Sequence, residues 1–322
     1  MKKMKNSTLV KFGIAATCVL LTSSCATTVT AGGSEFAGGS IEPIAELTDV
    51  AFTVGSKEYD EQLVLSQIAI VALEAAGAKV KDQTGLQGTG TVRKALTSEQ
   101  IDLYWEYTGT GWFEILAQTQ PYQAAELYTV TSEMDLATNK ISWLAAAPMN
   151  DTYAIGVTQK FSKESGITSI SEMADYIESN PGSDTLCVES EFLQRPDGLA
   201  GMLTAYGMQE MESMKMGGAV IHTQLATGDT CNFGAINSTD GRLVGLKLMS
   251  LEDDKGFFPA YNPAVTLREE TLQKYPSIKD LMEPIAAKID TLTITELNSQ
   301  AADGTSPRTV AENWLRAEGL IG

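Results

Sequence analysis

Histidine is almost absent from this chain of 322 residues, in which His222 stands alone. Nucleophilic catalysis by serine or cysteine needs a neighbouring base, and no Gly-x-Ser-x-Gly motif accompanies His222. A single histidine without a Cys-x-x-Cys pair also argues against a metal site. We therefore predict no enzyme, no catalytic residue, no metal and no cofactor. A hydrolase built on two carboxylates stays open, although no motif supports it.

Basic residues are also scarce: 23 lysines and arginines face 41 aspartates and glutamates, which gives a net charge of −18. Such a surplus of acid argues against nucleic acid as a partner. It suits a secreted, soluble and monomeric protein. It also favours cationic or zwitterionic solutes over anions.

Long apolar runs are missing, apart from a short one near the N-terminus. Lys2, Lys3, Lys5 and Lys11 precede an apolar run at 12–21. A run of about ten residues is half of what a helix needs to cross a bilayer. A basic start followed by a short apolar core is typical of a secretory signal peptide, which we place at 1–24.

The end of this segment reads Leu21-Thr22-Ser23-Ser24-Cys25 and resembles a bacterial lipobox, in which the cysteine is lipidated. Leu21 lies four places before Cys25, whereas three is usual, so ordinary cleavage at a small residue is the alternative. Residues 25–47 are rich in Ala, Thr, Gly and Ser, and we predict a lipid-anchored flexible tether there. The protein is then exported to the outer face of the cytoplasmic membrane or to the periplasm.

The rest of the chain contains two cysteines, Cys187 and Cys231. In an oxidising compartment such a lone pair is a candidate disulfide. The alternative is two buried free thiols.

The length of the chain beyond the tether predicts more than one hydrophobic core. About 275 residues remain there, which suits two lobes better than one. Apolar periodicity predicts strands at 50–54, 79–81 and 101–105, with helices at 59–76 and 91–96 between them. This alternation is typical of an α/β lobe with a parallel sheet.

A second α/β series follows a helix predicted at 123–147 and opens with a strand at 153–158. We therefore assign residues 48–150 and 259–322 to lobe I and residues 151–258 to lobe II. The chain then crosses twice between the lobes. A ligand cleft is expected between them, at the carboxyl ends of the strands.

Six short segments carry a resemblance when they are taken in order. They are Gly55-Ser56-Lys57-Glu58-Tyr59-Asp60-Glu61-Gln62, Glu106-Tyr107-Thr108-Gly109-Thr110, Asn150-Asp151-Thr152-Tyr153-Ala154, Glu191-Phe192-Leu193-Gln194-Arg195-Pro196-Asp197-Gly198, Ser238-Thr239-Asp240-Gly241 and Phe258-Pro259-Ala260-Tyr261. Together they resemble the binding proteins of ABC importers for glycine betaine, choline and carnitine. The resemblance implies a two-lobed type II periplasmic-binding-protein fold, a quaternary-ammonium solute, and a permease and an ATPase as partners.

Three tyrosines match the aromatic cage of that family: Tyr107, Tyr153 and Tyr261. A trimethylammonium group has no N–H to donate, so aromatic faces hold it, at about 0.5–2 kcal/mol each. Tyrosine suits a wet cleft because its hydroxyl can stay solvated. Asp151 matches the family position whose oxygen faces the methyl groups.

Lys57, Thr110 and Arg195 match the carboxylate clamp of the family. An arginine can hold both oxygens of a carboxylate, and such a clamp favours a betaine over choline. Gln62 matches a further polar position. Arg195 has an alternative role, which is to bridge Asp197 or Glu191 within the chain.

One position departs from the family pattern, because Asn237 stands where many members carry a fourth tyrosine. Phe233, Trp112 or Tyr59 are the aromatic residues that could fill this gap. We expect weaker binding of simple betaines, or a solute of another shape such as ergothioneine, carnitine or proline betaine. Choline binding and a sensor lipoprotein without a transport role stay open as alternatives.

Overall fold

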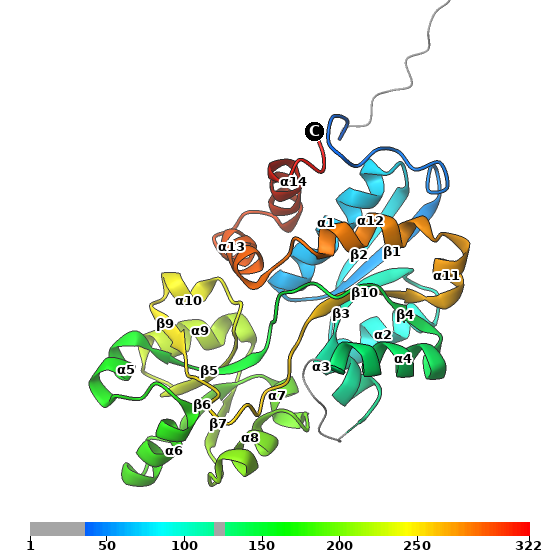
Figure 1. Cartoon of the computed structure of the whole chain (residues 1–322). Helices are drawn as coiled ribbons and strands as arrows, with labels where there is room; N and C mark the ends of the chain where they lie inside the picture. Colours follow the sequence, from blue (N-terminus) through cyan, green and yellow to red (C-terminus); the bar gives the residue numbers. More distant parts are fainter. Residues whose placement is uncertain (1–35, 119–125) are drawn as a thin grey trace, which may run out of the picture. The chain divides into compact units, whose positions relative to one another are not determined.

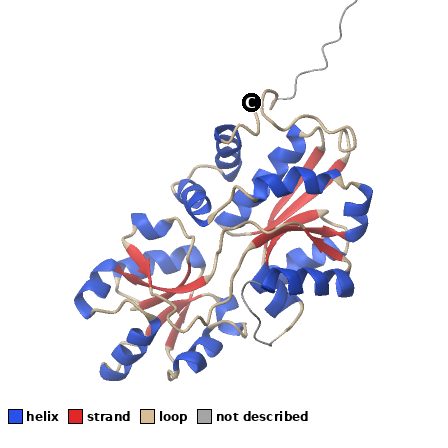
Figure 2. Ribbon diagram, viewed as in Figure 1, coloured by secondary structure: helices blue, strands red, loops and turns tan. Residues whose placement is uncertain are grey.

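The strands of this protein form two separate sheets. The computed structural model describes residues 36–118 and 126–322. Each sheet has five strands within these residues, and helices flank both (Figure 2). Both sheets belong to one compact unit, and the chain crosses between them twice.

The first sheet, that of lobe I, has the strand order β2-β1-β3-β10-β4. Its strands are β1 (Ala51–Lys57), β2 (Lys79–Leu86), β3 (Leu103–Tyr107), β4 (Ile141–Trp143) and β10 (Pro263–Arg268). β1 is parallel to β2 and β3, whereas β10 runs antiparallel to β3 and β4. The predicted parallel arrangement is confirmed for β1, β2 and β3. β10 was not predicted as a strand, and it makes the sheet mixed because it enters from the other sheet and not through a strand–helix–strand crossover.

Lobe I also contains most of the longer helices (Figure 1). They are α1 (Asp60–Ala75), α2 (Thr89–Thr97), α3 (Thr108–Thr110), the π-helical turn η1 (Gly111–Ile115), α4 (Leu127–Asn139), α11 (Glu269–Lys274), α12 (Ser277–Ala286), α13 (Thr291–Ala302) and α14 (Pro307–Ala317). Nearly every side chain of α1 is buried, because this helix packs on β1 and β2 and also contacts α12, α13 and α14. An apolar run around all sides is the pattern of such a buried helix.

The second sheet, that of lobe II, has the order β7-β6-β8-β5-β9. Its strands are β5 (Tyr153–Thr158), β6 (Thr185–Val188), β7 (Glu212–Lys215), β8 (Phe233–Asn237) and β9 (Leu248–Ser250). Its helices are α5 (Gln159–Ser165), α6 (Ile170–Ser179), α7 (Ser190–Gln194), α8 (Leu199–Tyr206), α9 (Gly218–Thr227) and α10 (Arg242–Gly245). β5 lies antiparallel to β8 and β9, so this sheet is mixed as well.

The helix predicted at 123–147 is too long. Residues 119–125 lie outside the described residues, and α4 ends at Asn139. Lys140 adopts a left-handed conformation with φ of 59°, which ends the helix. Residues 141–143 then form β4, whose three side chains are all buried. The apolar pattern of the sequence therefore did not distinguish the helix from the buried strand that follows it.

The predicted flexible tether at 25–47 is wrong for its second part. Phe36 and Leu47 are buried in the core of lobe I. The amides of Ser40 and Ile41 donate to the carbonyls of Gly319 and Leu320, both at 2.9 Å. Residues 36–47 are thus fixed by backbone pairing with the C-terminal segment. Residues 25–35, Cys25 and the predicted signal peptide lie outside the described residues.

The predicted disulfide is present between Cys187 on β6 and Cys231, which precedes β8. Both residues are buried in lobe II. Replacing both by alanine is expected to lower the free energy of unfolding by about 2–4 kcal/mol, because the bridge closes a long loop in the unfolded chain. Urea unfolding of the oxidised protein and the variant tests this, and equal midpoints would contradict it.

Candidate ligand-binding site

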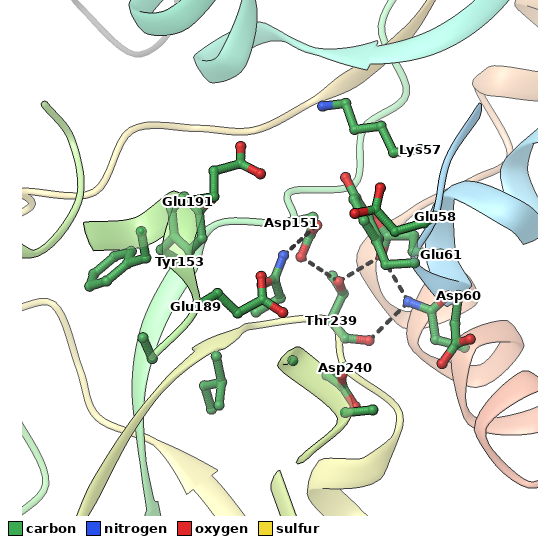
Figure 3. A pocket seen from close by; sticks show the side chains of 18 of the residues that line it. Lys57, Glu58, Asp60, Glu61, Asp151, Tyr153, Glu189, Glu191, Thr239 and Asp240 are labelled. Atoms are coloured by element: carbon green, nitrogen blue, oxygen red, sulfur yellow. Dashed lines mark hydrogen bonds between the residues drawn. The ribbon is translucent and has the colours of Figure 1, made fainter. Parts of the chain in front are cut away.

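A cavity of about 410 Å³ is lined by residues of both lobes (Figure 3). Lobe I contributes the carboxyl ends of β1 and β3, the first turn of α1, and Asn298 of α13. Lobe II contributes the start of β5, the end of β8, and the N-terminus of α9. Its volume lies within the usual range for small-molecule sites.

Seven of the nine predicted ligand-binding residues line this cavity: Lys57, Tyr107, Thr110, Asp151, Tyr153, Asn237 and Tyr261. Gln62 and Arg195 are not among the lining residues. Gln62 is fully buried and joins β1 to β3, since its amide donates to the carbonyl of Trp105 at 3.0 Å and accepts from the amide of Lys57 at 3.3 Å. Its position is that of a scaffold residue.

The two crossing segments bring distant residues together because they pair with each other. The amide of Asp151 donates to the carbonyl of Tyr261 at 3.1 Å. The side chain of Asn150 accepts from the amide of Tyr261 at 2.7 Å. Thr152 donates to the carbonyl of Pro259 at 2.9 Å. This pairing places three residues at one edge of the cavity: Asp151, Tyr261, and Tyr153 as the first residue of β5.

The aromatic side chains of the cavity form two groups. Tyr153 lies against Tyr261 in an edge-to-face pair, with ring centroids 5.5 Å apart, and against Phe192 at 5.0 Å. Tyr59 stacks on Tyr107 with centroids 6.4 Å apart. The three predicted tyrosines are thus brought to one cavity, and two further rings line it with them.

The position of the missing fourth tyrosine holds Asn237, whose amide donates to Asp151 at 2.9 Å. Among the candidates to fill this gap, Tyr59 lines the cavity, whereas Phe233 and Trp112 do not. Phe233 is buried in the core of lobe II against Phe161.

Lys57 is buried and already paired with a carboxylate. Its ammonium lies 2.7 Å from Glu106 and 5.2 Å from the ring centroid of Tyr107. Glu106 is fully buried and also accepts from the hydroxyl of Tyr104 at 2.9 Å. The positive charge next to the cavity is thus balanced within the chain.

Arg195 has every N–H engaged. It donates to both oxygens of Asp197 at 2.9 Å, to Glu114 at 2.9 Å, to Glu191 at 3.1 Å and to the hydroxyl of Tyr261 at 2.8 Å. An arginine carries five such donors. This geometry matches the alternative interpretation, in which Arg195 bridges carboxylates of the chain. It also joins the lobes, because Glu114 belongs to η1 of lobe I.

Glu114 makes stability depend on pH. Burial and repulsion by Glu191, partly offset by Arg195, raise the pKa of Glu114 to about 7. The folded state then holds this proton more tightly than the unfolded chain, so the stabilisation is complete below about pH 4.3 and is lost as pH rises through 7. We expect Glu114→Gln to flatten the decline in unfolding free energy over this window, measured by urea unfolding at several pH values. A steeper decline in the variant would contradict this.

A network of carboxyl groups joins the lobes beside the cavity. The hydroxyl of Thr239 lies 2.7 Å from Glu61 and 2.7 Å from Asp151 (Figure 3). Glu61 also accepts from Tyr107 at 2.7 Å and from Asn298 at 2.8 Å. Burial, with Asp151 as a further cause, raises the pKa of Glu61 well above its usual value, and burial raises the pKa of Asp151.

The lining of the cavity is strongly acidic. Seven carboxyl groups face one lysine and one arginine; the acids are Glu58, Asp60, Glu61, Asp151, Glu189, Glu191 and Asp240. The arginine, Arg242, is itself paired with Asp60 and Asp240. Such a lining favours a positively charged group in the cavity.

Several lining residues were missed by sequence reasoning. Glu61 and Thr239 lie within the quoted segments, so a signal was present in the sequence for both. Phe192 also lies in a quoted segment. Asn298 comes from α13, far along the chain, and no motif surrounds it.

No group of three or more His, Cys, Asp or Glu residues that could hold a metal occurs within 36–118 and 126–322. In the same residues no helix combines the length and the apolar character needed to span a bilayer.

This chain is similar to known proteins over most of its length. A family profile described as the substrate binding domain of ABC-type glycine betaine transport system matches residues 51–317. The glycine betaine-binding protein YehZ of Escherichia coli (strain K12) is 31% identical over 275 residues, which cover 83% of this chain and 90% of that protein. A glycine-betaine-binding protein of Pseudomonas aeruginosa is 33% identical over 276 residues, which cover 83% of this chain and 88% of that protein.

The fold has counterparts among solved structures. The apo structure of YehZ from Escherichia coli superposes with a TM-score of 0.65 at 29% identity, and the match covers 84% of this chain and 99% of that one. The predicted fold class, a two-lobed α/β periplasmic-binding-protein fold, is thereby confirmed.

Proposed function

Because this chain belongs to the family of substrate-binding domains of ABC-type glycine betaine transport systems, we propose that its cavity captures a quaternary-ammonium solute, with glycine betaine or a related betaine as the first candidate. Proteins of this family are extracytoplasmic substrate-binding proteins of ABC importers and not enzymes. They bind small solutes and work with a permease and an ATPase.

The observation that carries the proposal is the combination of aromatic rings and carboxylates around one cavity. Tyr107, Tyr153 and Tyr261 line it together with seven acidic side chains and two basic ones. A quaternary ammonium has no N–H to donate, so its recognition needs π faces, apolar contact and negative charge without hydrogen bonds. Primary amines instead bind through short, directional hydrogen bonds, and metal ions bind through closely coordinating oxygen ligands.

The basic residues that could bind the other end of the solute are already paired within the chain. A betaine carboxylate that binds Lys57 has to compete with Glu106, and one that binds Arg195 has to compete with Asp197, Glu114 and Glu191. Thr110 lines the cavity and is a neutral donor for a carboxylate or a hydroxyl. This pairing within the chain makes choline, which has no carboxylate, the second candidate. It also leads us to expect weak binding of simple betaines.

Capture is reversible in this proposal and requires no covalent chemistry. Lobes that rotate about their two crossing segments admit the solute and then enclose it. The solute shifts this equilibrium because it binds the enclosed form better than the open one.

Isothermal titration calorimetry tests the proposal with glycine betaine, proline betaine, choline, carnitine and ergothioneine. The uncharged carbon isostere of the trimethylammonium group separates charge from shape: 3,3-dimethylbutanoate for glycine betaine and 3,3-dimethyl-1-butanol for choline. We expect saturable binding of at least one ammonium solute and a loss of binding for its isostere. Equal binding of both members of a pair would contradict recognition of the cationic charge. Turnover of a bound solute would instead support an enzyme.

We also propose that Cys25 carries a lipid anchor, on the basis of the residues 21–25 that precede the body of the chain. Metabolic labelling with an alkyne fatty acid is expected to modify the full-length chain, and Cys25→Ser is expected to abolish the label. Cys18→Ser is the matched control and is expected to keep it. Labelling that survives Cys25→Ser would overturn the anchor.

A further inference from the structure

The contact between the lobes at Thr239 has more acceptors than hydrogens. Thr239 follows β8 of lobe II, whereas Glu61 lies in the first turn of α1 in lobe I, and Asp151 lies in a crossing segment. All three side chains are almost fully buried. The hydroxyl oxygen of Thr239 lies 2.7 Å from one oxygen of Glu61 and 2.7 Å from one oxygen of Asp151.

A hydroxyl group has one hydrogen to donate. Two ionised carboxylates at this distance would leave one of the two oxygen–oxygen contacts without a proton, although 2.7 Å is the usual length of an O–H···O bond. The second contact therefore needs a proton on a carboxyl group, which then donates to the oxygen of Thr239.

The other hydrogen-bond partners indicate which of the two carboxyl groups carries the proton. Glu61 accepts from Tyr107 and Asn298 in addition to Thr239, which suits an ionised carboxylate. The other oxygen of Asp151 accepts from Asn237 at 2.9 Å. A chain of donors from a protonated Asp151 through Thr239 to Glu61 satisfies every one of these bonds. The pair nevertheless titrates as one unit, because the two carboxyl groups are strongly coupled.

We propose that Glu61 and Thr239 are positioning residues that join the two lobes through a proton shared with Asp151, so that formation of this contact takes up one proton from solvent. Two ionised carboxylates and one hydrogen ion become one carboxylate and one carboxylic acid. When the lobes separate, water reaches Glu61, and both carboxyl groups ionise at neutral pH.

The sign of the pH dependence follows from this proton. Burial raises the pKa of both acids in the contact form. The stabilisation by this proton is therefore complete below the ordinary pKa of a carboxyl group. Above it the equilibrium constant of the contact falls by about tenfold for each pH unit, until the pH passes the raised pKa of the pair and the stabilisation is lost.

Other charged groups lie around the network, and most of them are already paired. Asp240 contacts Arg242 and His222, Arg242 also contacts Asp60, and Lys57 pairs with Glu106. The phenol of Tyr107, at the end of β3, donates to Glu61, and Tyr59, directly before α1, stacks on Tyr107. Asn298 of α13 is neutral and donates both to Glu61 and to the carbonyl of Thr239, at 3.0 Å. Burial raises the pKa values of the Tyr59 and Tyr107 phenols well above their usual value.

Asp151→Asn is the decisive variant, because an amide reproduces the protonated acid. Its amide nitrogen can donate to Thr239, while its oxygen accepts from Asn237, and no proton is needed. We expect this variant to keep the contact but to lose the pH dependence that comes from the shared proton, whereas the contribution of Glu114 stays. Thr239→Ser keeps the hydroxyl and should behave as the wild type, whereas Thr239→Val should weaken the contact at every pH.

Two measurements on the ligand-free protein test the proposal. Carbon-13 NMR of labelled Asp and Glu carboxyl carbons is expected to show one protonated carboxyl of the Glu61–Asp151 pair at neutral pH, assigned with Asp151→Asn and Glu61→Gln. Hydrogen exchange of residues 237–245, with α6 as an internal reference, is expected to show protection that falls with pH in the wild type and in Thr239→Ser, and that falls less steeply in Asp151→Asn.

Two ionised carboxyl groups in the wild type at neutral pH would overturn the proposal, as would equal pH dependence of protection in wild type and Asp151→Asn. Neither measurement uses a solute. Failure of the solute titrations therefore bears on the proposed function alone, and failure here bears on the shared proton alone.

Discussion

Replacement of Arg195 by alanine is expected to lower the free energy of unfolding by about 3–5 kcal/mol. The guanidinium is the common partner of Asp197, Glu114 and Glu191 and lies 5.6 Å from the ring centroids of Tyr153 and Tyr261. Without it, the buried carboxylate of Asp197 loses its only charged partner and keeps the hydroxyl of Tyr261 as a neutral donor among the described residues. Urea unfolding followed by circular dichroism measures the effect.

Arg316→Ala is the matched control for this experiment. Arg316 pairs with Glu312 at 3.5 Å on the surface, and exposed pairs contribute about 0–1 kcal/mol. The double variant Arg195→Ala/Asp197→Asn should recover part of the loss, because the stranded charge is removed. Equal unfolding midpoints for Arg195→Ala and Arg316→Ala would show that Arg195 is not the central partner of this cluster.

Replacement of Tyr153 by alanine is expected to weaken binding of the captured quaternary-ammonium solute by about 2- to 30-fold, which corresponds to the 0.5–2 kcal/mol of one aromatic face. Tyr153 begins β5 at the cavity and contacts the rings of Tyr261 and Phe192, so its loss also removes support from two other walls. Calorimetry with the solute that binds the wild type best measures the change.

Two control variants distinguish the loss of the aromatic ring from a general loss of structure. Tyr153→Phe keeps the aromatic face and should bind within about twofold of the wild type. Tyr176→Ala removes a half-buried tyrosine of the same lobe, on α6 and against Phe161, that does not line the cavity. Its affinity should match that of the wild type. Unchanged binding by Tyr153→Ala would remove this residue from the proposed site.

These two residues differ in how far the sequence predicted them. The strand at 153–158 was predicted with its observed bounds, because an apolar run flanked by polar residues has few other solutions, and Tyr153 therefore stands at a strand end. The sequence around Arg195 allowed two roles, as a clamp for a solute or as a bridge between carboxylates. The choice depended on Glu114 and Tyr261, which lie far from Arg195 in the chain.

The sequence by itself determined the class of fold, the presence of two lobes and most of the cavity tyrosines, and it made Cys187 and Cys231 a candidate disulfide that the structure then joined. Each of these depends on local periodicity, on composition, or on short segments in a fixed order. The tertiary structure alone decided that residues 36–47 are packed, that β10 is antiparallel, and that Glu61, Thr239 and Asn298 meet beside Asp151. The reason is physical: charge balance and hydrogen-bond partners are set by groups that approach through space, and local sequence carries no record of which distant side chain fills a buried donor or acceptor.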